Sequence, residues 1–234
     1  MDAKDDMTAY VLRDYNFAHF DPEMRVVDIG CGRGKMLQRL VGRGCRAMGV
    51  EPEPDRLRAC KALGLDVVAA HAEHLPLASA SFDGVVCKAV IPLTVESLAI
   101  GEIARILKPG GTAQICYQGF GFYLRLLILG SGGWLKQRVY GARSIVNTWL
   151  FAVTGRVLPG LWGDTMYQSS RRLRRYYAQH GLRLIAWTPS KKFLGWPVFI
   201  YHKVERVGVR PSTFARDATG ATAPEEARET VGAR

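Results

Sequence analysis

An apolar strand that runs directly into a glycine-rich turn and a helix constrains this chain most. Residues 26–37 read VVDIGCGRGKML, in which the apolar run ends at Asp28 and glycines follow as Gly30, Gly32 and Gly34. A glycine turn between a strand and a helix brings bare backbone and a helix N-terminus close to a ligand. The segment therefore predicts a ligand-binding turn in a fold in which strands alternate with helices.

The same alternation of apolar strands and helices continues through residues 26–118. Further strands are expected at RAMGVE, DVVAAHA, FDGVVCKA and TAQICYQ, and helices at GKMLQRLVGRG, EPDRLRACKALG and VESLAIGEIARILKPGG. A helix is also expected at SSRRLRRYYAQHG, followed by an antiparallel pair at LRLIAWTPSK and PVFIYHKVE. This order predicts an α/β fold with a Rossmann-like, seven-stranded, mostly parallel sheet and helices on both faces.

The length of 234 residues fits one domain, which we expect over residues 1–205. Residues 119–168 interrupt it with aromatic, Leu, Gly and Arg residues and no strand pattern, so we expect a helical lid insertion of two or three short helices. Residues 206–234 are poor in apolar residues and are predicted to be a disordered tail. A helix folded over the sheet is expected within residues 1–20.

The composition indicates a cytoplasmic protein without a metal site. The sequence after Met1 is acidic and polar, unlike a secretory signal, and no apolar run reaches about 18 residues. The five cysteines are scattered, form no CxxC pair and have no histidine at ligand spacing. Free thiols in a reducing compartment are therefore expected.

The net charge of +11 is concentrated in one segment. Residues 1–118 contain 14 basic and 15 acidic residues, and residues 204–234 contain five of each. Residues 119–203 contain 13 basic residues and a single acid, Asp164, which gives this segment a net charge of +12. Three hypotheses fit: a lid with solvated arginines, a surface that meets an anionic amphiphile or the cytoplasmic face of a membrane, or an RNA-binding surface.

The glycine turn departs from the pattern that binds dinucleotides. The third glycine of G-x-G-x-x-G is replaced by Lys35, and the charge of Asp28 would oppose a pyrophosphate. The same charge suits the ammonium and sulfonium groups of S-adenosylmethionine. Glu51 ends the second strand 21 positions after Gly30, close to the interval of about 20 residues at which an acid accepts ribose hydroxyls. The pattern thus favours S-adenosylmethionine as the ligand.

Four motifs together resemble the class I S-adenosylmethionine-dependent methyltransferases of the small-molecule "type 11" kind. They read VVDIGCGRG, GVEPEPDRL, HAEHLPLASASFDGVVC and EIARILKPGG, and the resemblance covers about residues 20–118. It implies methyl transfer from S-adenosylmethionine. The family usually has an Asp directly before the Ala at position 72; here His71 replaces it, and its neutral imidazole can accept one hydrogen bond. The implied cofactor-binding residues are Asp28, Gly30, Cys31, Gly32 and Gly34 at the methionine end, Glu51 and Pro52 at the ribose, His71, Ala72 and Glu73 at the adenine, and Lys88 near the sulfonium.

The motifs do not identify the methyl acceptor. We expect a small-molecule, lipid or glycan-linked acceptor, because the Asn-Pro-Pro-aromatic motif of adenine-N6 methylation is absent. An RNA methyltransferase that uses the basic residues 119–203 is one alternative, and a non-catalytic S-adenosylmethionine-binding protein is another. The catalytic residue is unassigned, because simpler structural roles suit each candidate base: Tyr117, Asp164, His19 and His180.

Overall fold

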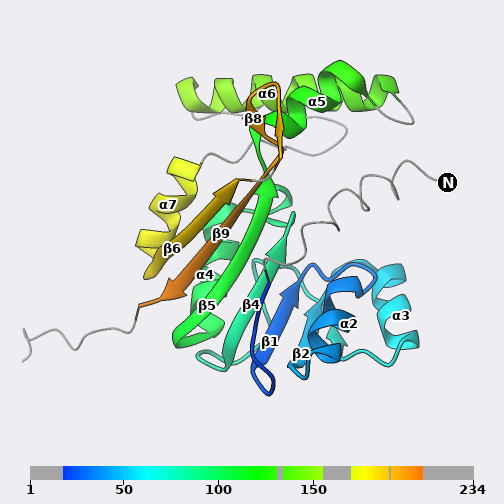
Figure 1. The fold of residues 1–234 in the computed structure, drawn as a ribbon, viewed down its shortest axis with the longest axis vertical. Coiled ribbons are helices and arrows are strands. Elements are labelled where there is room, and N and C mark those ends of the chain that lie inside the picture. The colour runs from blue at the N-terminus through cyan, green and yellow to red at the C-terminus, as the bar shows by residue number, and fades with distance from the viewer. Residues whose placement is uncertain (1–17, 131–133, 155–169, 190, 208–234) are drawn as a thin grey trace, which may run out of the picture.

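The computed structural model describes residues 18–130, 134–154, 170–189 and 191–207. Seven strands form one sheet in the order β3-β2-β1-β4-β5-β9-β6 (Figure 1). β9 runs antiparallel to its neighbours β5 and β6, and the pairs among the first five strands are parallel. The strands are β1 (Arg25–Ile29), β2 (Arg46–Val50), β3 (Val67–Val68), β4 (Phe82–Lys88), β5 (Leu107–Gln118), β6 (Leu182–Pro189) and β9 (Phe199–Arg206).

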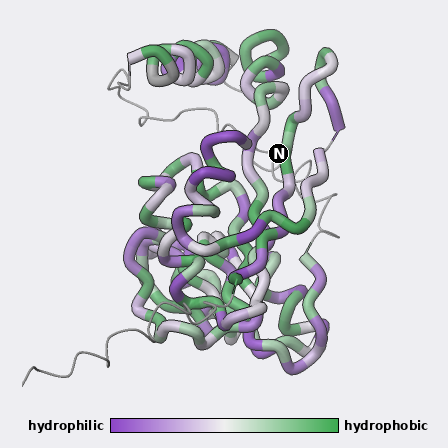
Figure 2. The backbone as a smooth tube through the Cα atoms, turned by 90° about the vertical axis from the view of Figure 1, so that its left-hand side faces the viewer, coloured by the Kyte–Doolittle hydropathy of each residue, from purple (hydrophilic) through white to green (hydrophobic). Residues whose placement is uncertain are grey.

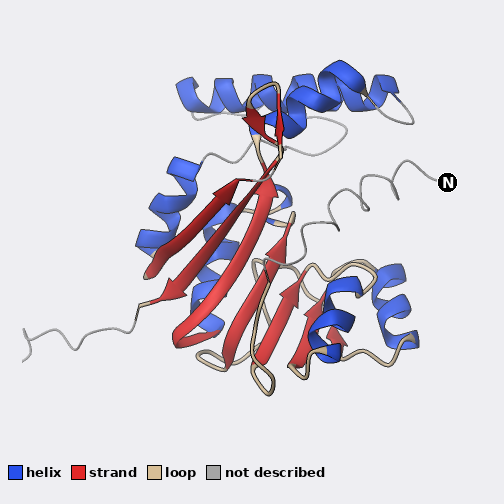
Figure 3. Ribbon diagram, in the orientation of Figure 1, coloured by secondary structure: helices blue, strands red, loops and turns tan. Residues whose placement is uncertain are grey.

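Helices cover both faces of this sheet, which confirms the predicted fold class (Figure 3). They are α2 (Lys35–Gly42), α3 (Pro54–Ala62), α4 (Glu96–Ile106) and α7 (Ser170–Gln179), with a 3₁₀ turn at Ile91–Leu93. α4 and α7 pack against each other and bury Ile100, Ile103 and Leu173 on one face. α2 buries Met36 and Leu40 on the opposite face, against Val26 and Val86 of the sheet.

The predicted lid begins directly after β5. α5 (Phe120–Leu129) and α6 (Trp134–Thr154) form a cap beyond the end of this strand, set apart from the rest of the sheet (Figures 1 and 2). A hairpin of β7 (Lys192–Phe193) and β8 (Trp196–Pro197) packs against α5. Of the helices in the described ranges, none combines the length and the apolar character needed to cross a bilayer.

Two sequence predictions need correction, and three others lie wholly or mostly outside the described ranges. α4 ends at Ile106, earlier than the stop expected at Pro109 and the two glycines after it. Leu107 is already extended (ψ 141°), and Lys108, as the residue before a proline, disfavours the helical region. α6 has 21 residues, so the described part of the lid is not made of short helices alone. The predicted N-terminal helix, the lid residues 155–168 and most of the tail fall on residues that are not described.

Candidate functional site

The glycine turn lies between β1 and α2 and is hydrogen-bonded to the end of β2. Gly30, Gly32 and Gly34 all have positive φ, at 69°, 60° and 78°, a region that residues with a Cβ rarely adopt. The backbone N–H groups of Gly30 and Cys31 donate to the carbonyl of Val50 at 2.8 and 3.1 Å. The turn is therefore held in one conformation at the carboxyl ends of β1 and β2.

The three glycines have different surroundings. A Cβ on Gly30 would lie 2.2 Å from Cγ2 of Val90, and a Cβ on Gly34 would lie 2.5 Å from Cδ1 of Leu65. A Cβ on Gly32 would meet nothing within 4 Å. Gly30 and Gly34 are thus required for close packing within the fold, whereas the backbone of Gly32 faces open space that a ligand can enter.

Glu51 connects the end of β2 to this turn. Its carboxylate is buried, and Oε2 accepts the backbone N–H of Gly32 at 2.8 Å. Oε1 accepts the backbone N–H of Glu53 at 3.1 Å and lies 3.6 Å from Nη1 of Arg56. The predicted ribose-binding acid is therefore part of the glycine turn itself.

Asp28 is a buried carboxylate that the described residues leave incompletely paired. Its side chain is 3% exposed, and Oδ2 has no hydrogen-bond partner within the described ranges. Burial raises the pKa of Asp28 to about 7; the nearby Lys88 ammonium acts in the opposite direction and the Glu51 carboxylate in the same one. A buried carboxylate without a full set of partners is costly, and a positively charged ligand group would stabilise it.

The strand register places two further polar groups on the same face of the sheet as Asp28. Asp28 pairs with Val86, and Lys88, two positions further along β4, pairs with Cys116 of β5. Because side chains alternate along a strand, Gln118 at the end of β5 shares this face. The buried Oε1 of Gln118 lacks a hydrogen-bond partner within the described ranges. Sequence reasoning missed Gln118 because a polar residue at a strand end carries no distinctive pattern.

The predicted adenine-binding residues lie on the loop between β3 and β4. Ala72 is buried, and Oε1 of Glu73 accepts the backbone N–H of Val95 at 3.0 Å, directly before α4. The side chain of His71 is exposed, as is that of Pro52 after β2. The contacts of these residues with adenine stay predictions, and Glu73 has a structural role at the start of α4.

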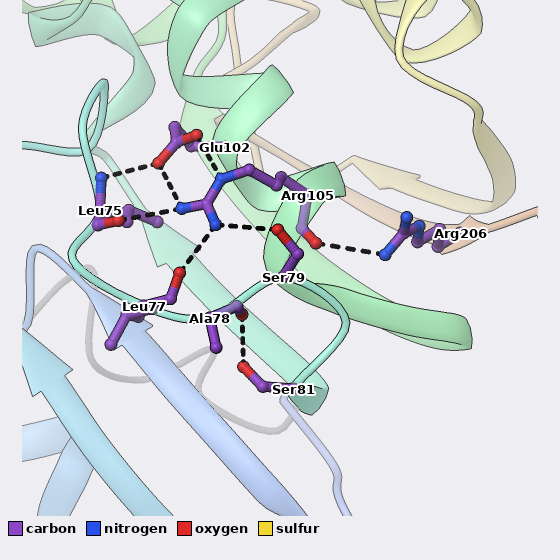
Figure 4. A network of polar contacts seen from close by, with 8 residues as sticks. All are labelled: Leu75, Leu77, Ala78, Ser79, Ser81, Glu102, Arg105 and Arg206. Atoms are coloured by element: carbon purple, nitrogen blue, oxygen red, sulfur yellow. Dashed lines mark hydrogen bonds and ion pairs between the residues drawn. The ribbon is translucent and has the colours of Figure 1, made fainter.

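Arg105 of α4 holds the remainder of this loop in place (Figure 4). Its guanidinium donates to the carbonyls of Leu75 and Leu77 at 2.9 and 2.7 Å and to both carboxylate oxygens of Glu102 at 2.7 Å. Oε2 of Glu102 in turn accepts the backbone N–H of Leu75 at 2.7 Å. The loop that would border the adenine is therefore fixed to α4 by a network of charge-assisted hydrogen bonds.

Comparisons with known proteins agree with this geometry. A family model described as a methyltransferase domain matches residues 27–115. The chain is 39% identical over 89 residues to an uncharacterized methyltransferase of Mycobacterium tuberculosis, and the match spans 37% of each protein. Residues 27–115 thus match a methyltransferase domain, and this match implies S-adenosylmethionine as the cofactor.

Solved structures share the fold of the whole methyltransferase domain. An S-adenosylmethionine-dependent methyltransferase from Mesorhizobium loti superimposes with a TM-score of 0.62 at 15% identity, covering 84% of this chain and 96% of that one. Another, from Methanosarcina mazei, gives a TM-score of 0.59 at 18% identity, covering 82% and 96%. At this identity the likeness is one of fold.

The residues of the methyltransferase domain fit S-adenosylmethionine. The unpaired Oδ2 of Asp28 can interact with the cationic groups of the cofactor. The open space at Gly32 can admit its methionine end, and Glu51 lies where an acid is predicted to bind its ribose. Cys31 is buried in the same turn, and burial raises the pKa of its thiol, so that the thiol stays protonated and uncharged beside Asp28. Lys88 lies near enough to Asp28 to lower that carboxyl's pKa, and its place near the sulfonium stays a prediction.

The candidate bases of the methyltransferase domain have structural roles or lie elsewhere. Tyr117 is fully buried, and its hydroxyl hydrogen-bonds Ser170 at 2.7 Å and His202 at 3.0 Å. His180 contacts the Ser97 hydroxyl of α4 at 3.2 Å. His19 is exposed, and Asp164 lies outside the described residues. No base is therefore assigned from the described part of the chain.

Proposed function

We propose that the protein transfers the methyl group of S-adenosylmethionine to a small-molecule, lipid or glycan-linked acceptor. The observation that carries this proposal is the buried, incompletely paired carboxylate of Asp28 beside the open backbone of Gly32. A dinucleotide would place phosphates against this carboxylate, whereas the cofactor of the domain brings a cation. The similar methyltransferase of M. tuberculosis matches over 37% of its length and does not indicate the acceptor.

The reaction is an in-line displacement in which the acceptor's lone pair forms a bond to the methyl carbon. The C–S bond breaks, its electron pair stays on sulfur, and the sulfonium becomes a neutral thioether; the acceptor releases a proton if it carried one. S-adenosylmethionine, when bound, supplies this electrophilic methyl group. The chain's own contribution is alignment of the two reactants and exclusion of water, which can lower a barrier by several kcal/mol.

Gln118 supports a polar acceptor on the same face of the sheet. Its buried Oε1 can accept a hydrogen bond from an amino or hydroxyl group and would hold that group near the carboxyl ends of β4 and β5. A neutral amine needs no base to attack, and an acceptor that is already ionised needs none either. Gln118→Leu should therefore raise KM for the acceptor more than it lowers kcat, with cofactor affinity unchanged.

The proposal is tested by incubating the protein and radiolabelled S-adenosylmethionine with fractionated cell extract. Label in the lipid or small polar fraction, lost with Glu51→Ala, is the expected result. Label confined to RNA would replace the acceptor class with nucleic acid. Tight cofactor binding with no label in any fraction would identify a binding protein and contradict catalysis.

A further inference from the structure

The long helix α6 packs against α5 with a mixed face, on which neutral polar residues are buried beside apolar ones. Ser144 and Asn147 are fully buried against the cap, and Gly141 is buried between them and α5. A Cβ on Gly141 would lie 2.7 Å from the carbonyl oxygen of Tyr123, which shows how closely the two helix backbones approach. The inner face also carries Tyr140 and Ile145, which pack against the cluster that contains Phe122, Tyr123 and Leu126 of α5, and the other apolar residues of α6 lie elsewhere.

These apolar residues form a single exposed stripe along the opposite face. Their spacing is four, seven, three and four positions, which keeps them within one helix face at 3.6 residues per turn. Exposed fractions range from 42% to 67%. The apolar stripe consists of Leu135, Val139, Val146, Trp149 and Val153.

Three basic side chains of α6 flank the apolar stripe, within a segment of high positive charge. In the described part of residues 119–203 there are 12 Lys and Arg residues and no Asp or Glu, because Arg156 and Asp164 of the 13 and one counted above fall outside it. Lys136 and Arg143 lie about 80–100° around the helix from the centre of the stripe, on one flank. Arg138 lies on the other flank and donates to the carbonyl of Ile128 at 2.7 Å.

We propose that the apolar stripe of α6 docks on an anionic membrane surface. A helix with an apolar face bordered by Lys and Arg is the form that lies in the plane of a bilayer interface, with its apolar side chains among the acyl chains and its cations at the headgroups. Charge decides between the occupants: a second copy of the same cationic cap would repel the first. RNA would use the cations, but phosphates leave five exposed apolar side chains without a partner.

Because of the position of the cap, docking would bring the membrane to the side of the cofactor site where the acceptor enters. The cap continues from the end of β5, directly after Gln118, and stands beyond the carboxyl edge of the sheet where the cofactor site lies (Figure 1). A bilayer against α6 would face the same end of the molecule as the acceptor side of that site. The docking itself does not depend on catalysis, so its test is a binding measurement.

The test is co-sedimentation of the full chain with vesicles at physiological salt. We expect binding to vesicles with 30% anionic lipid, little binding to zwitterionic vesicles, and at least a tenfold weaker partition coefficient for Trp149→Glu. The matched control is Leu63→Glu on the C-cap of α3, where an apolar side chain is 55% exposed outside the cap; it should bind like the wild type. Lys136→Gln should weaken binding about fivefold, the factor of about 1 kcal/mol per basic residue at an anionic surface, and Lys61→Gln should not.

Three outcomes would overturn the docking proposal. The first is the absence of binding to anionic vesicles by a folded wild-type chain. The second is equal loss of binding in Trp149→Glu and Leu63→Glu. The third is a result that assigns the cap to another partner. Such a result is a wild-type dimer that becomes monomeric in Trp149→Glu, or an RNA shift at low salt that survives this substitution. Retained radiolabel transfer in Trp149→Glu would leave the methyl-transfer proposal standing whichever way the vesicle experiment falls.

Discussion

The glycine turn and helix α6 each place side chains opposite to the usual rule for a protein in water. At the turn the carboxylates of Asp28 and Glu51 are buried, although isolated carboxylates normally stay solvated. On α6 the five apolar side chains of the stripe are exposed, and the neutral polar Ser144 and Asn147 are buried. Both arrangements make sense if something outside the chain completes them.

The difference between the two regions lies in how specific the missing partner must be. The turn region has an unpaired oxygen on Asp28, an open backbone position at Gly32 and the acid Glu51, all in fixed geometry. Such directed groups favour a ligand of one particular shape and charge. The α6 stripe has exposed apolar side chains and basic neighbours but no polar group in a fixed position. It therefore fits an extended anionic and apolar surface, not one particular molecule. Substitutions at the turn should therefore act on cofactor affinity, and substitutions on the cap should leave that affinity alone.

The largest effect is expected for Glu51→Ala. Removing the carboxylate leaves the N–H groups of Gly32 and Glu53 without their acceptor and removes the predicted acceptor of the ribose hydroxyls, so S-adenosylmethionine should bind about 10- to 100-fold more weakly. Calorimetry measures this, and Glu53→Ala, which removes an exposed side chain next to the same turn, is the matched control. NADH should not bind; unchanged affinity in Glu51→Ala, or micromolar NADH binding, would contradict the cofactor assignment.

Asp28→Asn should separate stability from cofactor binding. In the folded protein the pKa of Asp28 is raised from 3.8 to about 7, so the unfolded chain loses this proton first. The stability that this group contributes is fully present below about pH 4 and is lost as pH rises through 7, by about 2–3 kcal/mol between pH 5 and 8. Denaturant titrations of Asp28→Asn should lack this fall.

Cofactor binding depends on the same proton with the opposite sign. A cation beside Asp28 favours the ionised carboxylate, so affinity for S-adenosylmethionine should increase as pH rises through about 7, and Asp28→Asn should bind weakly at every pH. A wild-type stability that does not change from pH 5 to 8, together with a pH-independent affinity, would contradict a titration of Asp28 in this range.

Gly141→Ala should affect the cap alone. The new Cβ would meet the carbonyl of Tyr123 at 2.7 Å and force α6 away from α5, which should cost about 1–2 kcal/mol in the free energy of unfolding. Gly42→Ala at the end of α2 meets nothing within 4 Å and should be neutral or slightly stabilising. A cofactor affinity that falls together with stability in Gly141→Ala would mean that the cap and the turn are coupled.

The sequence predicted the fold well where apolar patterns repeat. The alternation from Val26 to Gln118 and the final antiparallel pair are present in the sheet, because buried parallel strands need continuous apolar runs. The two-residue hairpin strands β7 and β8 were missed, since Lys192–Phe193 and Trp196–Pro197 are too short for a pattern. The third strand is paired only at Val67–Val68 of the predicted DVVAAHA.

The sequence predicted the cofactor turn but not the two exceptional features. A motif places Asp28 beside the glycines, yet only the structure shows that burial leaves one oxygen unpaired and raises the pKa of the carboxyl. For α6 the periodicity marks an apolar face without saying which way it points. That direction depends on Gly141 and Ser144, whose small size allows α5 to approach the polar side.

The smallest expected effect concerns His71, whose exposed side chain precedes the buried Ala72 on the loop predicted to border the adenine. Because the imidazole is predicted to accept a hydrogen bond from the adenine amino group, His71→Ala should bind S-adenosylmethionine a few-fold more weakly, and His71→Asp, which restores an acceptor, should bind like the wild type. His74→Ala, three positions along the same loop and also exposed, is the matched control and should bind like the wild type. Equal affinities of the wild type and His71→Ala in calorimetry would remove His71 from the adenine site.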